Sequence, residues 1–335
     1  MIGAANGTPI SITGLGTHVP ERVVTNDDLA KIVDTTDEWI VTRTGIRERR
    51  YAADDEALSD VALPAARAAL EQAGVGAADI DLVIVATVTP DMPFPSTAAL
   101  IADHLGATDA AAYDLAAGCT GFMYAIAQAF GMVESGLSRR SLVIGADVLS
   151  KIMDFADRST CVLFGDGAGA VVVEPSAEAG FLGFELGADG GGGKDLYLPA
   201  GGSRMPASAE TVARRAHTVQ MNGREVFKFA TRVLVSSARD VLARCDLSLD
   251  DVDVYVPHQA NVRIIDHAVA KLGIPKEKAI VNVDRYGNTS SASIPLALAD
   301  AVADGRVHQG STVLMTGMGA GLTWGSAVMR WTAPV

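Results

Sequence analysis

Short apolar runs alternate along the chain with longer segments in which apolar residues recur at helical spacing. Residues 81–88 have strand length and a near-continuous apolar character, which is typical of a parallel strand covered on both faces. Residues 58–73 are rich in alanine at helical spacing, and Gly74 follows them, so we expect a helix that ends there. The alternation predicts an α/β protein with buried sheets.

Both halves of the chain show this alternation. In the first half we expect a helix that begins at Thr25, further helices over 58–73, 96–105 and 120–134, and strands over 10–13, 81–88, 111–115, 141–146 and 169–174. In the second half we expect helices over 225–244, 262–272 and 292–303, and strands over 252–256, 279–283, 311–316 and 326–331. A polar, glycine-rich stretch over 187–210 is typical of a surface loop or flap. Two halves of similar length, residues 1–178 and 179–335, predict a duplicated fold with a site at their junction.

Composition and charge narrow the class of protein. The chain has 335 residues, of which 49% are hydrophobic and 20% charged, enough to build about two packed domains. The 27 basic and 40 acidic residues give a net charge of -13. A field of that sign repels nucleic acid and anionic lipid, so neither is an expected partner. An anionic ligand must therefore meet local cations.

Cysteine usage and the lack of targeting signals indicate the compartment. Three irregularly spaced cysteines make a disulfide framework or a zinc cluster improbable, which favours a reducing environment. The first residues lack the basic segment of a secretion signal, and no apolar run approaches the ~20 residues of a membrane span. We expect a soluble, cytoplasmic protein.

Cys119 is the first candidate for chemistry. It lies between an expected strand and an expected apolar helix, among the small residues of the sequence Ala-Ala-Gly-Cys-Thr-Gly. A cysteine at a helix N-terminus meets free backbone N–H groups and the helix dipole, which stabilise the thiolate and lower the pKa of the thiol. The alternative, a buried structural cysteine, stays open for Cys119 and is preferred for Cys161 and Cys245, which lie in apolar runs.

Two further polar residues lie at comparable turns. His258 directly follows the strand expected over 252–256, where side chains of a parallel sheet face the crevice that forms α/β sites. Asn288 lies at another expected strand-to-helix junction. Each alone is more often structural, the asparagine as a helix cap. Together with Cys119 they provide a nucleophile, a proton-handling imidazole and an amide donor, which suffice for acyl transfer.

Two glycine-rich segments are candidates for nucleotide-binding loops. Residues 317–325 lie between two expected strands, which argues against a phosphate-binding loop and favours backbone that approaches a ligand closely, with an N–H available to an oxyanion. Residues 165–169 also precede a strand, and we interpret their glycines as turn and packing residues.

Six motifs, in order, resemble the β-ketoacyl-acyl-carrier-protein synthase III family of the thiolase-like superfamily. They occupy 36–49, 117–122, 164–169, 256–263, 287–290 and 319–325, so the resemblance covers essentially the whole chain. It implies a duplicated αβαβα architecture in five layers. It also implies the decarboxylative condensation of a short acyl-CoA primer with malonyl-acyl carrier protein, which initiates fatty acid synthesis without a metal or redox cofactor.

The resemblance also implies the site. Cys119 is the nucleophile, His258 and Asn288 complete the triad, and the backbone N–H groups of Cys119 and Ala320 are the expected oxyanion hole. Other implied residues fall into three groups: coenzyme A contacts at Trp39, Arg43, Arg158, Asn261 and Gly223; an acyl pocket at Phe94, Leu149 and Met318; and a carrier-protein surface at Gln259, Ala260, Asn261, Val262, Arg263, Lys228 and Lys271. Trp39 and Arg158 would stack on adenine, Arg43 would meet the phosphates, and Phe94 would reach the pocket of a partner in a homodimer.

Three other functions remain as alternatives. A related enzyme could prime a polyketide pathway or transfer acyl groups to oxygen or nitrogen, although Asn288 favours decarboxylation because simple acyl transfer forms no enolate. A papain-type hydrolase shares the Cys-His-Asn chain order but not the local signature around Cys119. A non-catalytic acyl-CoA-binding protein has no need of the triad.

Overall fold

The computed structural model describes residues 9–177 and 180–333, and its first sheet is built from the apolar runs of the first half. The strand order is β1-β7-β6-β4-β5, formed by β1 (Ile10–His18), β7 (Asp166–Pro175), β6 (Ser141–Val148), β4 (Leu82–Ala86) and β5 (Ala111–Leu115). Strand β4 is parallel to β5 and β6, whereas β7 is antiparallel to both β6 and β1. The sheet is therefore mixed, and β4, within the range 81–88, is parallel to both of its neighbours as expected. Apolar runs report only that both faces are covered.

The second sheet repeats this arrangement. Its order is β11-β12-β13-β8, formed by β11 (Val254–Pro257), β12 (Thr312–Gly319), β13 (Thr323–Arg330) and β8 (Phe181–Ala188). Only β11 and β12 are parallel, so β8, β13, β12 and β11 match β1, β7, β6 and β4 in order and direction. The matching halves fit the expected duplication, and the boundary expected between residues 178 and 179 lies outside the described residues.

The strand expected over 279–283 is wrong. Ala279 makes a single parallel bridge to Tyr255 beside β11, and the Ile280 N–H donates to the Tyr255 carbonyl at 2.9 Å. The backbone N–H of Asn282 then donates to the side chain of Gln259 at 2.9 Å, and the chain turns into α10 (Val283–Tyr286). The segment occupies the edge position that β5 holds in the first sheet, but it leaves after one bridge.

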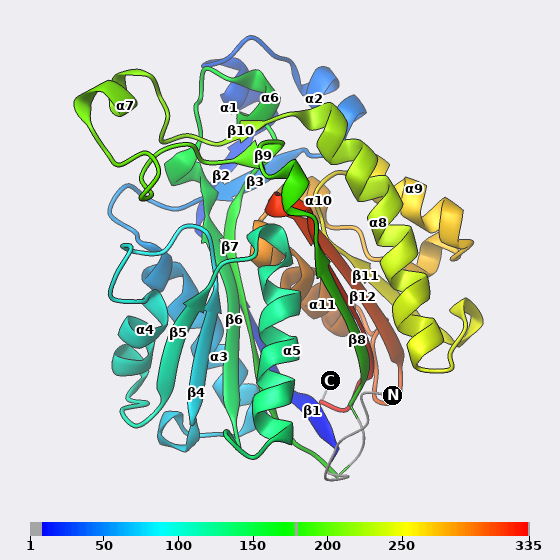
Figure 1. The fold of residues 1–335 in the computed structure, drawn as a ribbon. Helices are drawn as coiled ribbons and strands as arrows, with labels where there is room; N and C mark the ends of the chain where they lie inside the picture. Colours follow the sequence, from blue (N-terminus) through cyan, green and yellow to red (C-terminus); the bar gives the residue numbers. More distant parts are fainter. Residues whose placement is uncertain (1–8, 178–179, 334–335) are drawn as a thin grey trace.

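Helices complete five layers (Figure 1). Helices α3 (Leu58–Ala73) and α4 (Thr97–Leu105) cover the outer face of the first sheet, and α8 (Gly223–Arg244) and α9 (Val262–Leu272) pack on the outside of the second. Between the sheets lie α5 (Gly121–Glu134) and α11 (Ser293–Ala303), which contact strands of both. The fold is the expected αβαβα arrangement.

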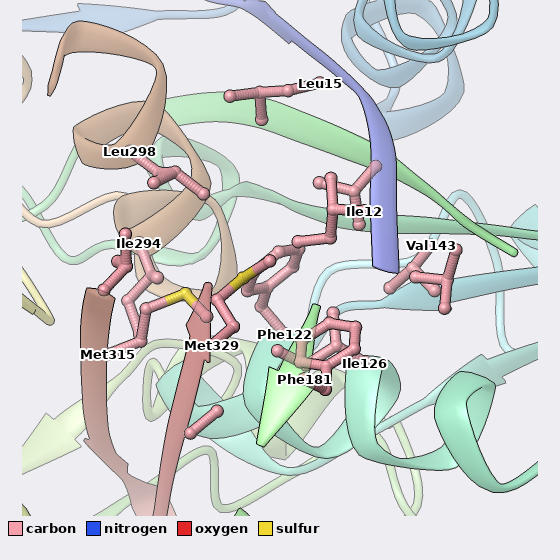
Figure 2. Close-up of a cluster of buried hydrophobic side chains, with 14 of the residues drawn as sticks. Ile12, Leu15, Phe122, Ile126, Val143, Phe181, Ile294, Leu298, Met315 and Met329 are labelled. Atoms are coloured by element: carbon pink, nitrogen blue, oxygen red, sulfur yellow. The ribbon is translucent and has the colours of Figure 1, made fainter. Parts of the chain in front are cut away.

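The central layer holds the largest apolar core. Side chains of α5 and α11 interdigitate there with side chains from both sheets, as Figure 2 shows for Phe122, Ile126, Ile294, Leu298, Met315 and Met329. Burial of such a core is the main stabilising term for the sheets it joins. The N-terminal ends of α5 and α11 are thereby fixed relative to one another.

Smaller elements surround the sheets. They are β2 (Arg22–Thr25) paired with β3 (Glu48–Tyr51), α1 (Asn26–Ala30), α2 (Asp37–Thr44), α6 (Arg158–Cys161), β9 (Leu196–Tyr197) paired with β10 (Gln220–Met221), and α7 (Ala209–Ala213). Single turns of 3₁₀ helix are η1 (Ala77–Asp79), η3 (Leu149–Ile152), η4 (Gly190–Gly192), η5 (Leu249–Asp251) and η6 (Lys276–Lys278). The expected loop over 187–210 thus contains β9. No helix in the described parts of the chain has both the length and the apolar character to cross a bilayer.

The glycine motif over 165–169 has only one of the two roles expected for it. Strand β7 begins at Asp166, so these glycines lie mostly within a strand and not in a turn. A Cβ at Gly169 would lie 2.5 Å from the ring of Pro295 on α11, and one at Gly165 would lie 2.3 Å from the carbonyl of Tyr286. The packing part of the interpretation holds, because the glycines let the two halves approach closely.

Candidate active site

Cys119 lies in η2 (Gly118–Thr120), the turn between β5 and α5, and is 8% exposed. Gly118 has a φ of +56, and a Cβ there would lie 2.7 Å from the backbone nitrogen of Ala320. Glycine therefore satisfies both the backbone conformation and the close approach of the second half. The sequence placed this thiol correctly, at the start of the helix that packs between the sheets.

The environment of Cys119 corrects the expected sign of its pKa shift. Burial raises the pKa of the Cys119 thiol to about 11, and the nearby carboxylate of Asp147 adds to the rise. The side chains of Ser290 and Asn288 lower the pKa but do not offset burial. The Cys119 side chain is therefore a neutral thiol at physiological pH, because desolvation outweighs the effect of the helix N-terminus.

His258 follows β11 directly and is almost fully buried. Its backbone N–H donates to the Thr316 carbonyl at 2.8 Å, and its Nδ1 lies 2.5 Å from the hydroxyl of Ser293. Its Nε2 is buried and has no hydrogen-bond partner among the described residues. Burial lowers the pKa of His258 from its usual value to about 3, so the imidazole is neutral at physiological pH.

Asn288 lies between α10 and η7 (Ser290–Ala292), not after a strand as expected. Its backbone N–H donates to the Leu163 carbonyl at 2.8 Å, and its carbonyl accepts from Gly165 at 3.0 Å. The side-chain Oδ1 accepts from the Ser290 N–H at 2.9 Å. This bond fixes the amide orientation and leaves the Nδ2 group as a donor.

The three residues face one cavity. Cys119, His258 and Asn288 all line a cavity of about 100 Å³, which we call the triad cavity. A second cavity of about 190 Å³ also reaches Cys119, and Phe164 and Leu196 line both. The thiol therefore lies where two largely apolar spaces meet.

Other expected site residues divide between these spaces. Gly223, Asn261 and Met318 line the triad cavity, and Met318 does not line the second cavity. Leu149 lines the second cavity. Phe94 lines neither of the two, and it is 84% exposed.

The aromatic and basic residues expected at coenzyme A lie together. Trp39 on α2 carries the guanidinium of Arg43 at 4.5 Å and that of Arg158, from α6, at 4.6 Å from its ring centroid. Arg158 also donates to the Asp34 carbonyl at 2.8 Å. This cluster presents one indole and two cations, which is suitable for a planar base with phosphates.

The expected carrier-protein surface is only partly a surface. Gln259 is 1% exposed, and its side chain donates to the carbonyls of Pro257 and Ile280, so it belongs to the scaffold. Ala260 is buried on the triad cavity. Asn261 caps α9 by accepting from the Arg263 N–H, and half-buried Val262 packs on Gly45. The exposed members are Arg263, Lys228 and Lys271.

Two backbone amides meet beside the thiol. A Cβ at Gly319 would lie 2.6 Å from the backbone nitrogen of Cys119, as one at Gly118 would meet that of Ala320. Ala320 opens η8 (Ala320–Leu322), directly after β12. The paired glycines bring both expected oxyanion donors to one place.

Three polar residues of the site were not found from the sequence. Ser290 has a φ of +50, and its buried hydroxyl acts to lower the pKa of both Cys119 and Asp147. Ser293 contacts the His258 ring, and the buried carboxylate of Asp147 accepts from Thr87 and Val88. A lone acidic residue after the apolar run 141–146 was the available signal. Within the described ranges, no group of three or more His, Cys, Asp or Glu residues could hold a metal ion.

Comparisons with known proteins agree with this geometry. The chain matches the family described as 3-oxoacyl-[acyl-carrier-protein] synthase III over residues 113–190, and that family's C-terminal domain over 242–331. A β-ketoacyl-[acyl-carrier-protein] synthase III of Symbiobacterium thermophilum is 58% identical over 96% of this chain and 98% of its own.

Solved structures give the same result. The synthase III of Thermus thermophilus has a TM-score of 0.89 and 51% identity, covering 96% of this chain and 99% of its own. The priming β-ketosynthase of the R1128 polyketide pathway has a TM-score of 0.91 and 40% identity, covering 98% of each chain. The chain therefore belongs to the β-ketoacyl-[acyl-carrier-protein] synthase III family.

Proposed function

We propose that the protein condenses a short acyl-CoA with malonyl-acyl carrier protein, releasing CoA and carbon dioxide and initiating fatty acid synthesis. One observation carries this function: Cys119, His258 and Asn288 line a single cavity, and a second apolar cavity begins at the same thiol. An acyl group on Cys119 can occupy the second cavity while a second thioester enters through the first.

The first half-reaction is an exchange of thiols. The Cys119 sulfur attacks the thioester carbon of the acyl-CoA, and the bond from that carbon to the CoA sulfur breaks. The proton lost by Cys119 ends on the departing CoA thiol, so atoms and charge balance. The backbone N–H groups of Cys119 and Ala320 would donate to the transient oxyanion, and the close approach of Gly118 to Ala320 and of Gly319 to Cys119 supports this role.

The second half-reaction forms the carbon–carbon bond. Malonyl thioester loses carbon dioxide, and the electron pair becomes an enolate on the thioester oxygen. His258 through Nε2 and Asn288 through Nδ2 can donate hydrogen bonds to that oxygen. The enolate carbon attacks the acyl-cysteine carbon, and the Cys119 sulfur leaves as a thiolate that takes up one proton from solvent, which gives the 3-ketoacyl product.

The exposed residues around the second cavity support a homodimer. Val88 and Leu198 line the second cavity and are 40% and 41% exposed, so the wall of this cavity is apolar but open. Phe94 is exposed on the β4–α4 connection, free to reach the matching opening of a second copy. A partner subunit would cover these residues and close the cavity.

The remaining contacts follow charge and shape. Adenine would insert at the Trp39–Arg158 pair, with Arg43 near the phosphates, and the pantetheine arm would pass Asn261 and Gly223 into the triad cavity. Arg263, Lys228 and Lys271 are exposed cations that would meet an acidic carrier protein despite the net charge of -13, and of these Lys228 is already paired with Glu225 at 2.7 Å. The three cysteines are unpaired, which supports a reducing, cytoplasmic setting.

A competition between acetyl-, isobutyryl- and longer acyl-CoA, with malonyl-acyl carrier protein as the second substrate, tests this function. We expect an acyl-Cys119 adduct by mass spectrometry and a 3-ketoacyl product. An adduct without carbon dioxide release would point instead to acyl transfer. Because a polyketide priming synthase is 40% identical, carrier proteins of both kinds of pathway belong in the assay.

A further inference from the structure

The imidazole ring of His258 has a hydrogen-bond partner, Ser293, that takes no part in the proposed reaction as described above. Ser293 is the first residue of α11 and is 1% exposed. Its hydroxyl oxygen lies 2.5 Å from His258 Nδ1 and accepts from the backbone N–H of Gln259 at 3.4 Å. These are the contacts of this hydroxyl within the described structure.

The two contacts determine the direction of the Ser293 bond. The Gln259 N–H is itself a donor, so it cannot accept the hydroxyl hydrogen. His258 Nδ1 is then the acceptor available to this buried hydrogen, and a buried donor left unpaired is costly. The Ser293 hydroxyl therefore donates to Nδ1, in a chain that runs from Gln259 N–H through Ser293 to the imidazole.

We propose that Ser293 is a positioning residue that holds His258 in the tautomer with its proton on Nε2. The inference rests on the proposed condensation and deepens it. A neutral imidazole carries one ring proton, and a donor at Nδ1 requires that proton to be on the other nitrogen. Burial keeps His258 neutral, so the tautomer and not the charge decides what Nε2 can do.

This tautomer has opposite effects on the two half-reactions. Nε2 faces the triad cavity without a partner in the described residues, so its N–H is ready for the enolate oxygen of the second half-reaction. Acceptance of the Cys119 proton needs the opposite tautomer, in which Nδ1–H points at Ser293 and the serine hydrogen loses its acceptor. Ser293 therefore favours decarboxylation and opposes the use of His258 as a base.

Ser293→Ala tests this by separating the two rates. We expect malonyl decarboxylation to fall about tenfold, the bias that one neutral hydrogen bond supplies, while Cys119 acylation is unchanged or faster. Ser293→Thr keeps the hydroxyl and is expected to restore decarboxylation. Ser237→Ala is the matched control, because it removes another buried serine hydroxyl. Ser237 lies on α8, and its hydroxyl oxygen is 2.7 Å from that of Ser326. Equal loss of both rates in Ser293→Ala, or no loss, would overturn the proposal.

Nitrogen NMR gives a readout independent of activity. In histidine-labelled protein, which contains six histidines, the His258 signals can be assigned by their absence in His258→Asn. We expect Nε2 to be the protonated nitrogen in the unsubstituted protein and protonated Nδ1 to appear in Ser293→Ala. Protonated Nδ1 in the unsubstituted protein would refute the inference. Absence of condensation with the expected tautomer present would refute only the proposed function.

Discussion

The two sheets share strand order and direction, yet the helices that follow them carry different chemistry. Helix α5 of the first half begins beside Cys119, and α11 of the second half begins after Asn288 and Ser290. In the proposed function, one half thus supplies the nucleophile and the other supplies the donors. The matched architecture brings both helix starts to the same place between the sheets, and the residues placed there determine the division of labour.

Burial shifts the pKa values of Cys119, in the first half, and His258, in the second half, in opposite directions. It raises the pKa of the Cys119 thiol and lowers that of the His258 imidazole, so both groups are neutral at rest. Hydrogen bonds join the halves at this point: the Ser291 hydroxyl donates to the Gly118 carbonyl at 3.1 Å, and its N–H donates to Asp147 at 3.2 Å. Contacts between the halves bring the site together, and contacts within the second half orient its groups, as Ser293 does for His258.

Loss of the nucleophile is the largest expected effect. Cys119→Ala removes the only thiol that lines the two described cavities, so acyl-CoA should leave no covalent adduct and no condensation product. Mass spectrometry of the intact protein after incubation with acyl-CoA measures this. Cys245→Ala, at the half-buried end of α8, is the control and should be acylated normally. An adduct that persists in Cys119→Ala would place the nucleophile elsewhere.

Loss of a donor from the second half should be selective. Asn288→Ala removes Nδ2, and loss of one preorganised oxyanion donor costs about 2.7–4 kcal/mol, or ~10²–10³ in rate. We expect condensation to fall by that factor while acylation of Cys119 falls much less, because no enolate forms in the first half-reaction. Single-turnover rates for each half-reaction measure the difference. A loss of equal size in both would show that Asn288 only shapes the site.

The sequence predicted the parts of the site that local pattern determines. Cys119 and His258 lie at the turns expected for them, because apolar periodicity located the adjoining helix and strand. The helix over 58–73 has the expected bounds, with Gly74 at a φ of +65 after it. Turn positions and helix ends are local properties, and local sequence is sufficient for them.

Properties set by distant contacts could not be predicted. The pKa of Cys119 depends on burial by the second half, which outweighs the helix end. Ser293 is 35 residues from His258 in sequence, and only the packing of α11 brings them together. Gln259 is a polar residue of a type common on exposed loops. Its side-chain amide, however, forms hydrogen bonds with backbone groups of Pro257, Ile280 and Asn282. These outcomes require the tertiary arrangement.

Acid should lower the free energy of unfolding through His258, which lies in the second half. The folded-state pKa of His258, about 3, lies below its unfolded value near 6.5, so the unfolded state binds the proton first. The corresponding stability is present above pH 6.5 and is lost as pH falls toward 3. Between about pH 7.5 and about pH 5 the loss is about 2 kcal/mol. In urea unfolding, the unsubstituted protein should lose more stability than His258→Asn over this pH range, by about that amount. Equal pH dependence in the two proteins would contradict the prediction.

The smallest expected effect lies on the surface of the second half. Arg263 is exposed at the start of α9, with its guanidinium 5.5 Å from the ring centroid of Phe227, so it is held near the triad cavity without an ion pair among the described residues. Arg263→Glu should raise KM for malonyl-acyl carrier protein about fivefold, most strongly at low salt, and leave KM for acyl-CoA nearly unchanged.

Arg67→Glu makes the same charge change on α3, the outer helix of the first half, and should alter neither constant. If both substitutions raise KM equally, the effect is one of net charge, and the carrier protein has no preferred half. If only Arg263→Glu does so, the carrier protein docks on the half that supplies the donors. The second thioester then enters past His258 and Asn288, the two residues that its enolate needs, while the acylated thiol waits on the other half.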